Sequence, residues 1–223
     1  MILLENVTKE FKSGRGLIKA LDNISLKVEK GSTVALFGKS GSGKTTLLNC
    51  IGGLDKPETG KVFIFDFEIH ALPEKSLCLF QRNNLGFIFQ HSNLLNYLSV
   101  FQNIAFPLEL NGFDKSRIKK RVHELLDITG LEGIDRAMPD ELSGGEAQRV
   151  AFARAIAHSP ELILADEPTA SLDTETGKEL VSFMFDMGRE QGCTMIIATH
   201  DLGILGLAGM KVQMRDGKVI KEE

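Results

Sequence analysis

The sequence predicts an α/β fold, and two observations indicate it. Short apolar runs of strand type recur along the 223 residues and alternate with segments of helical pattern. Several of these runs, Leu162–Ala165 and Thr194–Ala198 among them, are apolar throughout, which is typical of strands buried on both faces of a parallel sheet. We therefore expect a largely parallel sheet at the centre of the molecule.

The predicted elements follow from these runs in chain order. The strands are Ile2–Val7, Ile24–Val28, Thr33–Phe37, Val62–Phe65, Leu85–Phe89, Leu162–Ala165, Thr194–Ala198 and Val212–Arg215. Asp216-Gly217 follows the last of them and predicts a β-hairpin that ends at Ile220. The chain is thus expected to close with a hairpin.

The strand signals disappear between about residues 98 and 159. Asp114 can begin a helix that stops near Gly130, with apolar residues at i, i+4, i+7 and i+8, namely Ile118, Val122, Leu125 and Leu126. We expect one domain over residues 1–223, in which an α/β body of residues 1–97 and 160–223 carries a helical insert of residues 98–159.

Composition excludes several classes of protein. The net charge is −4, so no basic field favours a nucleic-acid partner. Cys50, Cys78 and Cys193 are scattered, which argues against a disulfide framework or zinc site and for a reducing cytosol. We expect no signal peptide and no membrane span, because the longest apolar stretch, Leu202–Met210, is interrupted by glycines.

A glycine-rich loop follows Thr33–Phe37 and matches the pattern G-x-x-x-x-G-K-[ST], and a helical segment, Thr46–Ile51, comes after it. Such a loop turns its amides towards phosphate, and the helix adds the positive end of its dipole. Lys44 would reach the β- and γ-phosphates, and Thr45 would bind Mg²⁺. The alternative is a chance glycine-rich turn. The predicted ATP-binding residues here are Gly38, Lys39, Ser40, Gly41, Ser42, Gly43, Lys44, Thr45 and Thr46.

Polar residues follow two other predicted strands. Asp166 and Glu167 come directly after Leu162–Ala165, at the strand end where open α/β sheets bind ligands. Asp166 would stand near Mg²⁺, and Glu167 would polarise the attacking water as a general base. The alternative is a solvated turn. His200 follows Thr194–Ala198 and is either a γ-phosphate sensor or a polar strand terminus.

The stretch LSGGEAQR, residues 142–149, precedes a predicted helix over Glu146–Ala157. Ser143 and Glu146 have the spacing of a capping box, in which each side chain satisfies a backbone amide of the other. The box does not explain the two glycines, Gly144 and Gly145, since glycine costs about 1 kcal/mol relative to alanine inside a helix.

Taken together, these motifs resemble those of the ATP-binding cassette (ABC) ATPases. The order runs from GKSGSGKT through Phe87–Gln90, LSGGEAQ, LILADEP and the loop Ala170–Asp173 to the strand before His200. The resemblance covers nearly the whole chain. It implies a P-loop NTPase fold with a RecA-like core, an antiparallel β-subdomain on the N-terminal side, and a helical subdomain that carries LSGGEAQ.

The resemblance also implies roles for particular residues. Gln90 would contact the metal or water and couple to a membrane partner. The catalytic residues would be Gln90, Lys44, Glu167 and His200. In an ATP-bound homodimer, residues of one protomer would reach the ATP of the other: Ser143, Gly144, Gly145, Glu146 and Asp173. Phe11 takes the place of the tyrosine that commonly stacks on adenine, and its alternative is ordinary packing.

The segments Asn93–Leu95 and Asn103–Leu110 resemble the lipoprotein-release, macrolide-efflux and haem or peptide exporter branch. Members of that branch pair with four-helix membrane permeases that bear a large extracytoplasmic region. This implies a cytoplasmic protein that is peripheral on the inner face of the cell membrane. The apolar residues beyond Gln90 are either its docking surface or helical-insert core: Leu94, Leu95, Tyr97, Leu98, Val100 and Phe101.

Two other functions remain open at this stage. An ATP-gated regulatory cassette would signal through a membrane partner without transport, and its site would be the same. A soluble cassette of DNA repair or translation would carry long coiled coils, zinc inserts or a second cassette, none of which is evident here.

Overall fold

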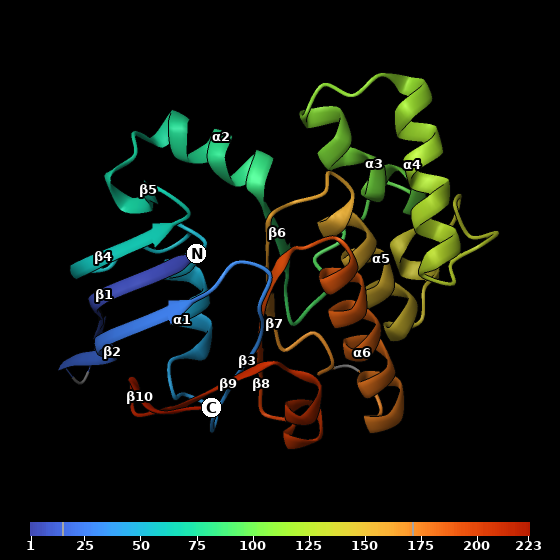
Figure 1. Cartoon of the computed structure of the whole chain (residues 1–223). Helices are drawn as coiled ribbons and strands as arrows, with labels where there is room; N and C mark the ends of the chain where they lie inside the picture. Colours follow the sequence, from blue (N-terminus) through green and yellow to red (C-terminus); the bar gives the residue numbers. More distant parts are fainter. Residues whose placement is uncertain (15, 171) are drawn as a thin grey trace.

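Figure 1 shows the computed structural model, which describes residues 1–14, 16–170 and 172–223. A six-stranded sheet has the strand order β10-β9-β3-β8-β7-β6. Its strands are β3 (Thr33–Phe37), β6 (Leu85–Ile88), β7 (Leu162–Asp166), β8 (Thr194–Thr199), β9 (Met210–Arg215) and β10 (Lys218–Glu222). The pairs among β9, β3, β8, β7 and β6 are parallel, and β10 is antiparallel to β9. The predicted parallel sheet and terminal hairpin are therefore present.

A second, antiparallel sheet lies to one side (Figure 1), with the strand order β2-β1-β4-β5. It consists of β1 (Ile2–Ser13), β2 (Gly16–Val28), β4 (Thr59–Ile64) and β5 (Phe67–Glu68). The helix α1 (Lys44–Ile51) contacts strands of both sheets, β2 and β4 on one side and β7 and β8 on the other. The first helix after the glycine-rich loop therefore joins the two sheets.

The remaining helices lie mostly on the opposite side of the parallel sheet (Figure 1). They are α2 (Glu74–Asn84), α3 (Val100–Leu110), α4 (Lys115–Ile128), α5 (Gly144–Ile156) and α6 (Thr174–Glu190), with 3-10 turns η1 (Ile69–Ala71), η2 (Pro139–Glu141) and η3 (Leu202–Leu207). Helices α3, α4 and α5 occupy the segment in which no strand was predicted. The side chain of Asp114 accepts hydrogen bonds from Ser116 N and Arg117 N, so it caps α4 as expected.

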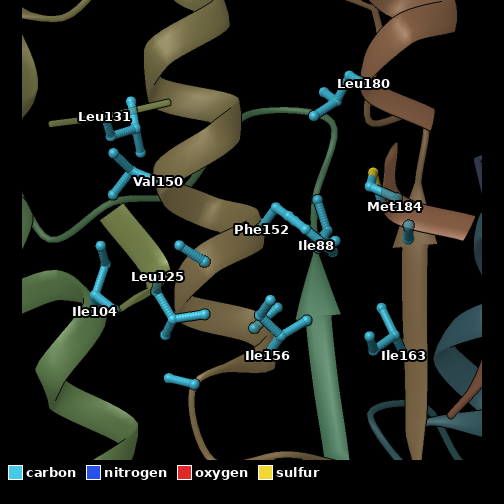
Figure 2. Close-up of a cluster of buried hydrophobic side chains, with 14 of the residues drawn as sticks. Ile88, Ile104, Leu125, Leu131, Val150, Phe152, Ile156, Ile163, Leu180 and Met184 are labelled. Carbon is cyan, nitrogen blue, oxygen red and sulfur yellow. The ribbon is translucent and has the colours of Figure 1, made fainter. Parts of the chain in front are cut away.

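Two hydrophobic clusters cover the two faces of the parallel sheet. One contains Leu162 and Leu164 of β7 and extends into the antiparallel sheet and α1. The other contains Ile163 of β7, with residues of α3, α4, α5 and α6; Figure 2 shows Phe152 of α5 beside Ile88 of β6. Alternate residues of one strand thus enter different cores, which explains why β7 and β8 are apolar throughout.

Several predicted boundaries were wrong, and most errors lie in the antiparallel sheet. The strands β1 and β2 are longer than Ile2–Val7 and Ile24–Val28. Their outer halves pair as a largely exposed hairpin, which has no regular apolar pattern that could have predicted it. Helix α2 carries only one fully buried residue, Phe80, and the apolar pattern did not predict it. Helix α5 begins at Gly144 rather than Glu146, because the Ser143 cap admits both glycines to its first turn.

The contact between α5 and β6 leads to a stability prediction. A Cβ at Gly86 would lie 2.5 Å from the backbone oxygen of Ala155. Because a helix backbone cannot easily retreat, Gly86→Ala should lower the free energy of unfolding by about 1–3 kcal/mol. Urea denaturation followed by circular dichroism measures this.

The matched control for that measurement is Gly206→Ala. No atom lies within 4 Å of a Cβ at Gly206, and its backbone is not left-handed. We expect a change within about 0.5 kcal/mol. Equal effects of the two substitutions would contradict the proposed close packing at Gly86.

Candidate nucleotide-binding site

The glycine-rich loop joins β3 to α1 and is in close contact with two distant segments. A Cβ at Gly38 would lie 2.3 Å from the backbone oxygen of Met214 in β9. At Gly43, where φ is +102°, a Cβ would lie 2.5 Å from the backbone oxygen of Ala20 in β2. Side chains at these two positions would push β9 and β2 away, so glycine is needed there for packing as well as for backbone conformation.

A cleft of about 590 Å³ opens beside this loop. Nine of the predicted site residues line it: Phe11, Ser40, Gly41, Gly43, Lys44, Thr45, Thr46, Gln90 and Glu167. Gly38, Lys39 and Ser42 belong to the same loop but are not among the lining residues. The lining therefore combines the glycine-rich loop and Glu167 with Phe11 of β1.

Five further residues line the cleft that were not predicted: Ile18, Lys19, Ala20, Asp216 and Gly217. The amide of Gly217 donates to Ser42 O (3.1 Å), and the amide of Asp22 donates to Gly217 O (2.8 Å). The turn between β9 and β10 is therefore attached to both the loop and β2. Asp216-Gly217 was recognised as a turn, but its place at the cleft depends on β9 pairing with β3, which no local pattern reveals.

Lys44 and Glu167 meet in the cleft. The buried Nζ of Lys44 donates to Gly38 O (3.0 Å) and lies 3.6 Å from Glu167 Oε1. Glu167 Oε2 lies 2.8 Å from His200 Nδ1. Glu167 also has a φ of +46°, a strained conformation for a non-glycine residue and one that often marks a functional site. Residues from the start of α1 and from the ends of β7 and β8 thus converge.

Asp166 is half-buried beside this group. Burial raises the pKa of the Asp166 carboxyl, a hydrogen bond with Thr45 lowers it, and the charge of Glu167 raises it further. Its Oδ1 is buried and has no hydrogen-bond partner in the part of the chain that the structure describes. A carboxylate oxygen of this kind, next to a hydroxyl, suits a hard divalent cation.

Gln90 and Phe11 also line the cleft and come from other segments of the chain. The backbone oxygen of Gln90 accepts a hydrogen bond from the buried Gln148 of α5 (3.0 Å), so its loop is tied to the helix that follows LSGG. The ring of Phe11 is 40% exposed and lies 5.2 Å from Lys9 Nζ. Phe11 also lines the cleft, so part of its ring is accessible there.

The remaining predicted residues are not at this cleft. Ser143 and Glu146 form the expected capping box at the start of α5, and Gly144 and Gly145 occupy its first turn. Asp173 caps α6 by accepting from the amides of Glu175 and Thr176. None of the five lines the cleft within this chain. In the loop Ala170–Asp173, residue 171 lies outside the described residues.

Glycine at position 145 has no evident purpose within the described chain. A Cβ there would meet only Leu172 Cδ2 at 3.5 Å and Arg149 Nη1 at 3.7 Å, which are ordinary contacts. Its backbone is helical and needs no left-handed conformation. The glycine is therefore not required by packing or backbone geometry in the single chain.

A parallel sheet, a phosphate-binding loop between β3 and α1, and two carboxylates at the end of β7 define a P-loop nucleoside triphosphatase. More particularly, residues 21–170 match the sequence model of the ABC transporter family, and the chain belongs to that family. It is an ATP-binding cassette with ATPase activity.

Named relatives agree with this assignment. An uncharacterised ABC transporter ATP-binding protein of Mycobacterium tuberculosis is 42% identical over 220 residues, covering 99% of this chain and 89% of the relative. The methionine import ATP-binding protein MetN of Carboxydothermus hydrogenoformans is 41% identical over 223 residues, covering 100% of this chain and 66% of MetN. The relatives therefore include an importer.

A solved structure is similar over the whole fold. The dimeric cassette MJ0796 of Methanocaldococcus jannaschii, in a post-hydrolysis state bound to ADP and Pi, superposes with a TM-score of 0.93 at 38% identity. The match covers 100% of this chain and 98% of that one. Among the described residues, no helix of the present chain has the length and apolar character of a membrane span.

The raised pKa of Asp166 leads to a pH-dependent prediction. A carboxyl whose pKa is higher in the folded protein than in the unfolded chain costs stability once it ionises, so the cost grows as pH rises above about 4. Asp166→Asn removes that charge. The nucleotide-free variant should therefore melt at a higher temperature than the wild type near neutral pH, and this advantage should shrink towards pH 4.

Scanning fluorimetry from about pH 4 to pH 8 measures this difference. Asp66→Asn, in an exposed turn, makes the same chemical change and is the matched control for the melting temperature. An advantage of Asp166→Asn that stayed constant across the pH range would contradict ionisation as its cause.

Proposed function

We propose that this chain is the ATP-hydrolysing subunit of an ABC transporter. Two copies would close around two ATP molecules, and closure and hydrolysis would drive membrane subunits. The observation that carries the proposal is that Glu167, which lines the cleft, contacts both Lys44 and His200. Lys44 supplies a positive charge that attracts phosphate, and Glu167 supplies a carboxylate that can polarise the attacking water. His200 forms a hydrogen bond that holds this carboxylate.

Within one copy, the loop from Gly38 to Thr46 binds the triphosphate. Its amides and the start of α1 face the phosphates, and Lys44 contributes the charge. Lys44 is already held by loop carbonyls, so little side-chain entropy is lost when the phosphate arrives. Phe11, which also lines the cleft, stacks on the adenine ring through its exposed face.

Mg²⁺ fits at Thr45 and Asp166. The unpartnered Oδ1 of Asp166 lies beside the Thr45 hydroxyl, and both are hard oxygen ligands. Mg²⁺ in nucleotide sites is commonly held by one or two protein ligands together with phosphates and water. Gln90, which lines the same cleft, would contact the cation or its water. When bound, Mg²⁺ neutralises phosphate charge.

Glu167 is the general base. Its carboxylate stands between Lys44 and His200, so it can accept the proton of a water molecule that attacks the γ-phosphate. The hydrogen bond to His200 Nδ1 and the strained backbone fix its direction. His200 is mostly exposed in the free chain, where its ring can also reach the γ-phosphate.

The second copy completes the site. Ser143, Gly144, Gly145 and Glu146 of one copy face the ATP of the other, and Asp173 crosses the same interface. The exposed start of α5 and the unexplained Gly145 support this arrangement, as does the dimeric state of the similar cassette from M. jannaschii. Bare amides at a helix start approach phosphate more closely than amides flanked by side chains.

Membrane subunits contact the surface around Gln90. A groove of about 300 Å³, lined by Phe87, Phe89, Leu95 and Phe106 among others, adjoins it. Of the residues weighed for docking, Val100 is fully buried, and Leu94 and Phe101 pack against the helical core, whereas Tyr97 is 76% exposed. We assign Leu95 and Tyr97 to the docking surface and Leu94, Val100 and Phe101 to the core. The half-buried Leu98 lies between the two groups and is assigned to neither.

We further propose that the transporter belongs to the exporter branch with four-helix permeases. The resemblance of Asn93–Leu95 and Asn103–Leu110 to that branch supports this. In the structure the buried Asn103 side chain bonds to Leu95 N (2.8 Å) and Leu98 O (2.9 Å), so the two segments form one unit beside the groove. Co-purification of a four-helix permease would support the branch, and co-purification of an importer permease would contradict it.

The assignment of the general base is tested by Glu167→Gln. Because the amide cannot accept the proton from water, turnover should fall by at least about 100-fold, while ATP binding persists and ATP-bound dimers accumulate. Phosphate release and size-exclusion chromatography with light scattering measure these two results.

Glu161→Gln is the control for that variant, because the exposed Glu161 precedes the other end of β7 and pairs only with Lys30 among the described residues. Its turnover should match the wild type. Normal turnover in Glu167→Gln would remove Glu167 as the base.

The composite site is tested by Gly145→Asp. The new carboxylate would oppose the partner's γ-phosphate, so ATP-driven dimerisation should be lost while the monomer binds ATP with unchanged affinity. Since a Cβ at this position meets only ordinary contacts, the free energy of unfolding should change by less than about 1 kcal/mol.

Gly145→Ala gives a graded comparison. A methyl group adds bulk without charge, so dimerisation should weaken less than with aspartate, and helix propensity should leave the monomer as stable or up to about 1 kcal/mol more stable. If both variants dimerise and turn over normally, the glycines serve only to begin the helix.

A further inference from the structure

The capping box at the start of α5 keeps Ser143 occupied in the free chain. Glu146 Oε2 accepts from both Ser143 N (2.8 Å) and Ser143 Oγ (2.6 Å), and Glu146 N donates to Ser143 Oγ (3.3 Å). The hydrogen bonds from Ser143, and then the charge of Arg149, hold the pKa of Glu146 below its usual value. Glu146 is therefore ionised at neutral pH.

This arrangement competes with the proposed composite site. A hydroxyl has one proton to donate, and here the short Oγ–Oε2 contact shows that it goes to Glu146. If Ser143 is to donate to the partner's γ-phosphate, that bond must break. The Glu146 carboxylate would also stand beside a second anion, which is unfavourable unless the carboxylate moves or is neutralised.

Arg149 lies three residues further along the same helix and is available to receive that carboxylate. Its Nε is buried and has no hydrogen-bond partner within the described ranges. Its Nη1 lies 3.7 Å from the position of a Cβ at Gly145, so the guanidinium already extends towards the first turn of α5. Residues three apart on a helix are neighbours, so Glu146 and Arg149 can pair.

The surroundings give Arg149 room to move. A cavity of about 270 Å³ is lined by Arg149 of α5 and by Thr176, Glu179 and Phe183 of α6, among others. The cavity lets the guanidinium of Arg149 reorient without repacking the helices. Besides Glu146, the other carboxylate near Arg149 is that of Glu179, which lines the same cavity. Pairing with Glu146 would satisfy a buried donor that is otherwise costly to leave unpaired.

We infer that Ser143, Glu146 and Arg149 form a two-position switch that sets how readily the copies close on ATP. In the free chain Glu146 bonds to Ser143. When the partner's γ-phosphate takes the Ser143 hydroxyl, Glu146 turns to Arg149. Glu146 thus opposes closure, and Arg149 is a positioning residue that lowers this opposition. The inference rests on the proposed composite site and adds its regulation.

The test is a double-mutant cycle in the Glu167→Gln background, where ATP-bound dimers persist. Glu146→Gln keeps the geometry of the box but replaces charge-assisted hydrogen bonds with neutral ones, which are roughly half as strong. The ATP concentration for half-maximal dimerisation, measured by light scattering, should fall about three- to ten-fold. Arg149→Met should raise it by a similar factor, and Arg149→Lys should restore most of the loss.

The double variant decides the question. If Arg149 acts by receiving Glu146, Arg149→Met should change dimerisation by less than about two-fold once Glu146→Gln is present. Effects that multiply independently, or no effect of Glu146→Gln, would overturn the switch. Monomer ATP affinity should stay constant. Because Glu146→Gln weakens the cap of α5, the urea midpoint should fall slightly in that variant, whereas a large fall would reveal a general folding defect.

Failure of the proposed function gives a different result. If the Glu167→Gln parent does not dimerise with ATP although the monomer binds it, the composite site itself is wrong and the switch is overturned with it. If the parent dimerises and the cycle is additive, only the switch is overturned.

Discussion

The close backbone contact at the phosphate loop is the constraint on which the rest of the site depends. Two positions without a Cβ, Gly38 and Gly43, let β9 and β2 approach the loop until their carbonyl oxygens lie where side-chain atoms would be. The β9–β10 turn then bonds to the loop through Gly217. Segments near both chain ends thereby form the cleft, and the same Gly38 supplies the carbonyl that holds Lys44. Packing and ligand binding depend on the same few atoms.

The charges in the cleft explain why this fold is suited to a triphosphate with a cation. One buried lysine faces the carboxylates of Asp166 and Glu167, and the pKa of Asp166 is raised because burial and Glu167 both disfavour its charge. Phosphate suits Lys44 and a divalent cation suits Asp166, so each ligand relieves a cost that the free chain carries. The unpaired charges at the site thus lower the stability of the free protein, and the bound ligands offset this loss.

Local sequence patterns predicted the parts of the site that lie within one segment of the chain. They did not predict the parts that strand pairing brings together from several segments. The loop, Asp166 and His200 each follow an apolar strand, and those strands are buried on both faces, so their signal was strong. Ile18 and Asp216 carry no such signal, because they reach the cleft through β1–β2 and β9–β3 pairing. The roles of Ser143 and Asp173 stay predictions, since they need a second chain.

The first turn of α5 shows how one local structure can serve both the free chain and a dimer. Helix starts need acceptors for their amides, and the Ser143–Glu146 box supplies them in the free chain. A γ-phosphate from a second copy is a stronger acceptor for the same donors, so the box and the phosphate are alternative ways to satisfy them. The choice between the two depends on what becomes of the displaced carboxylate. Because a buried, unpartnered Arg149 Nε lies within one helical turn, the exchange can keep every charge paired, and closure then depends on ATP rather than on contact alone.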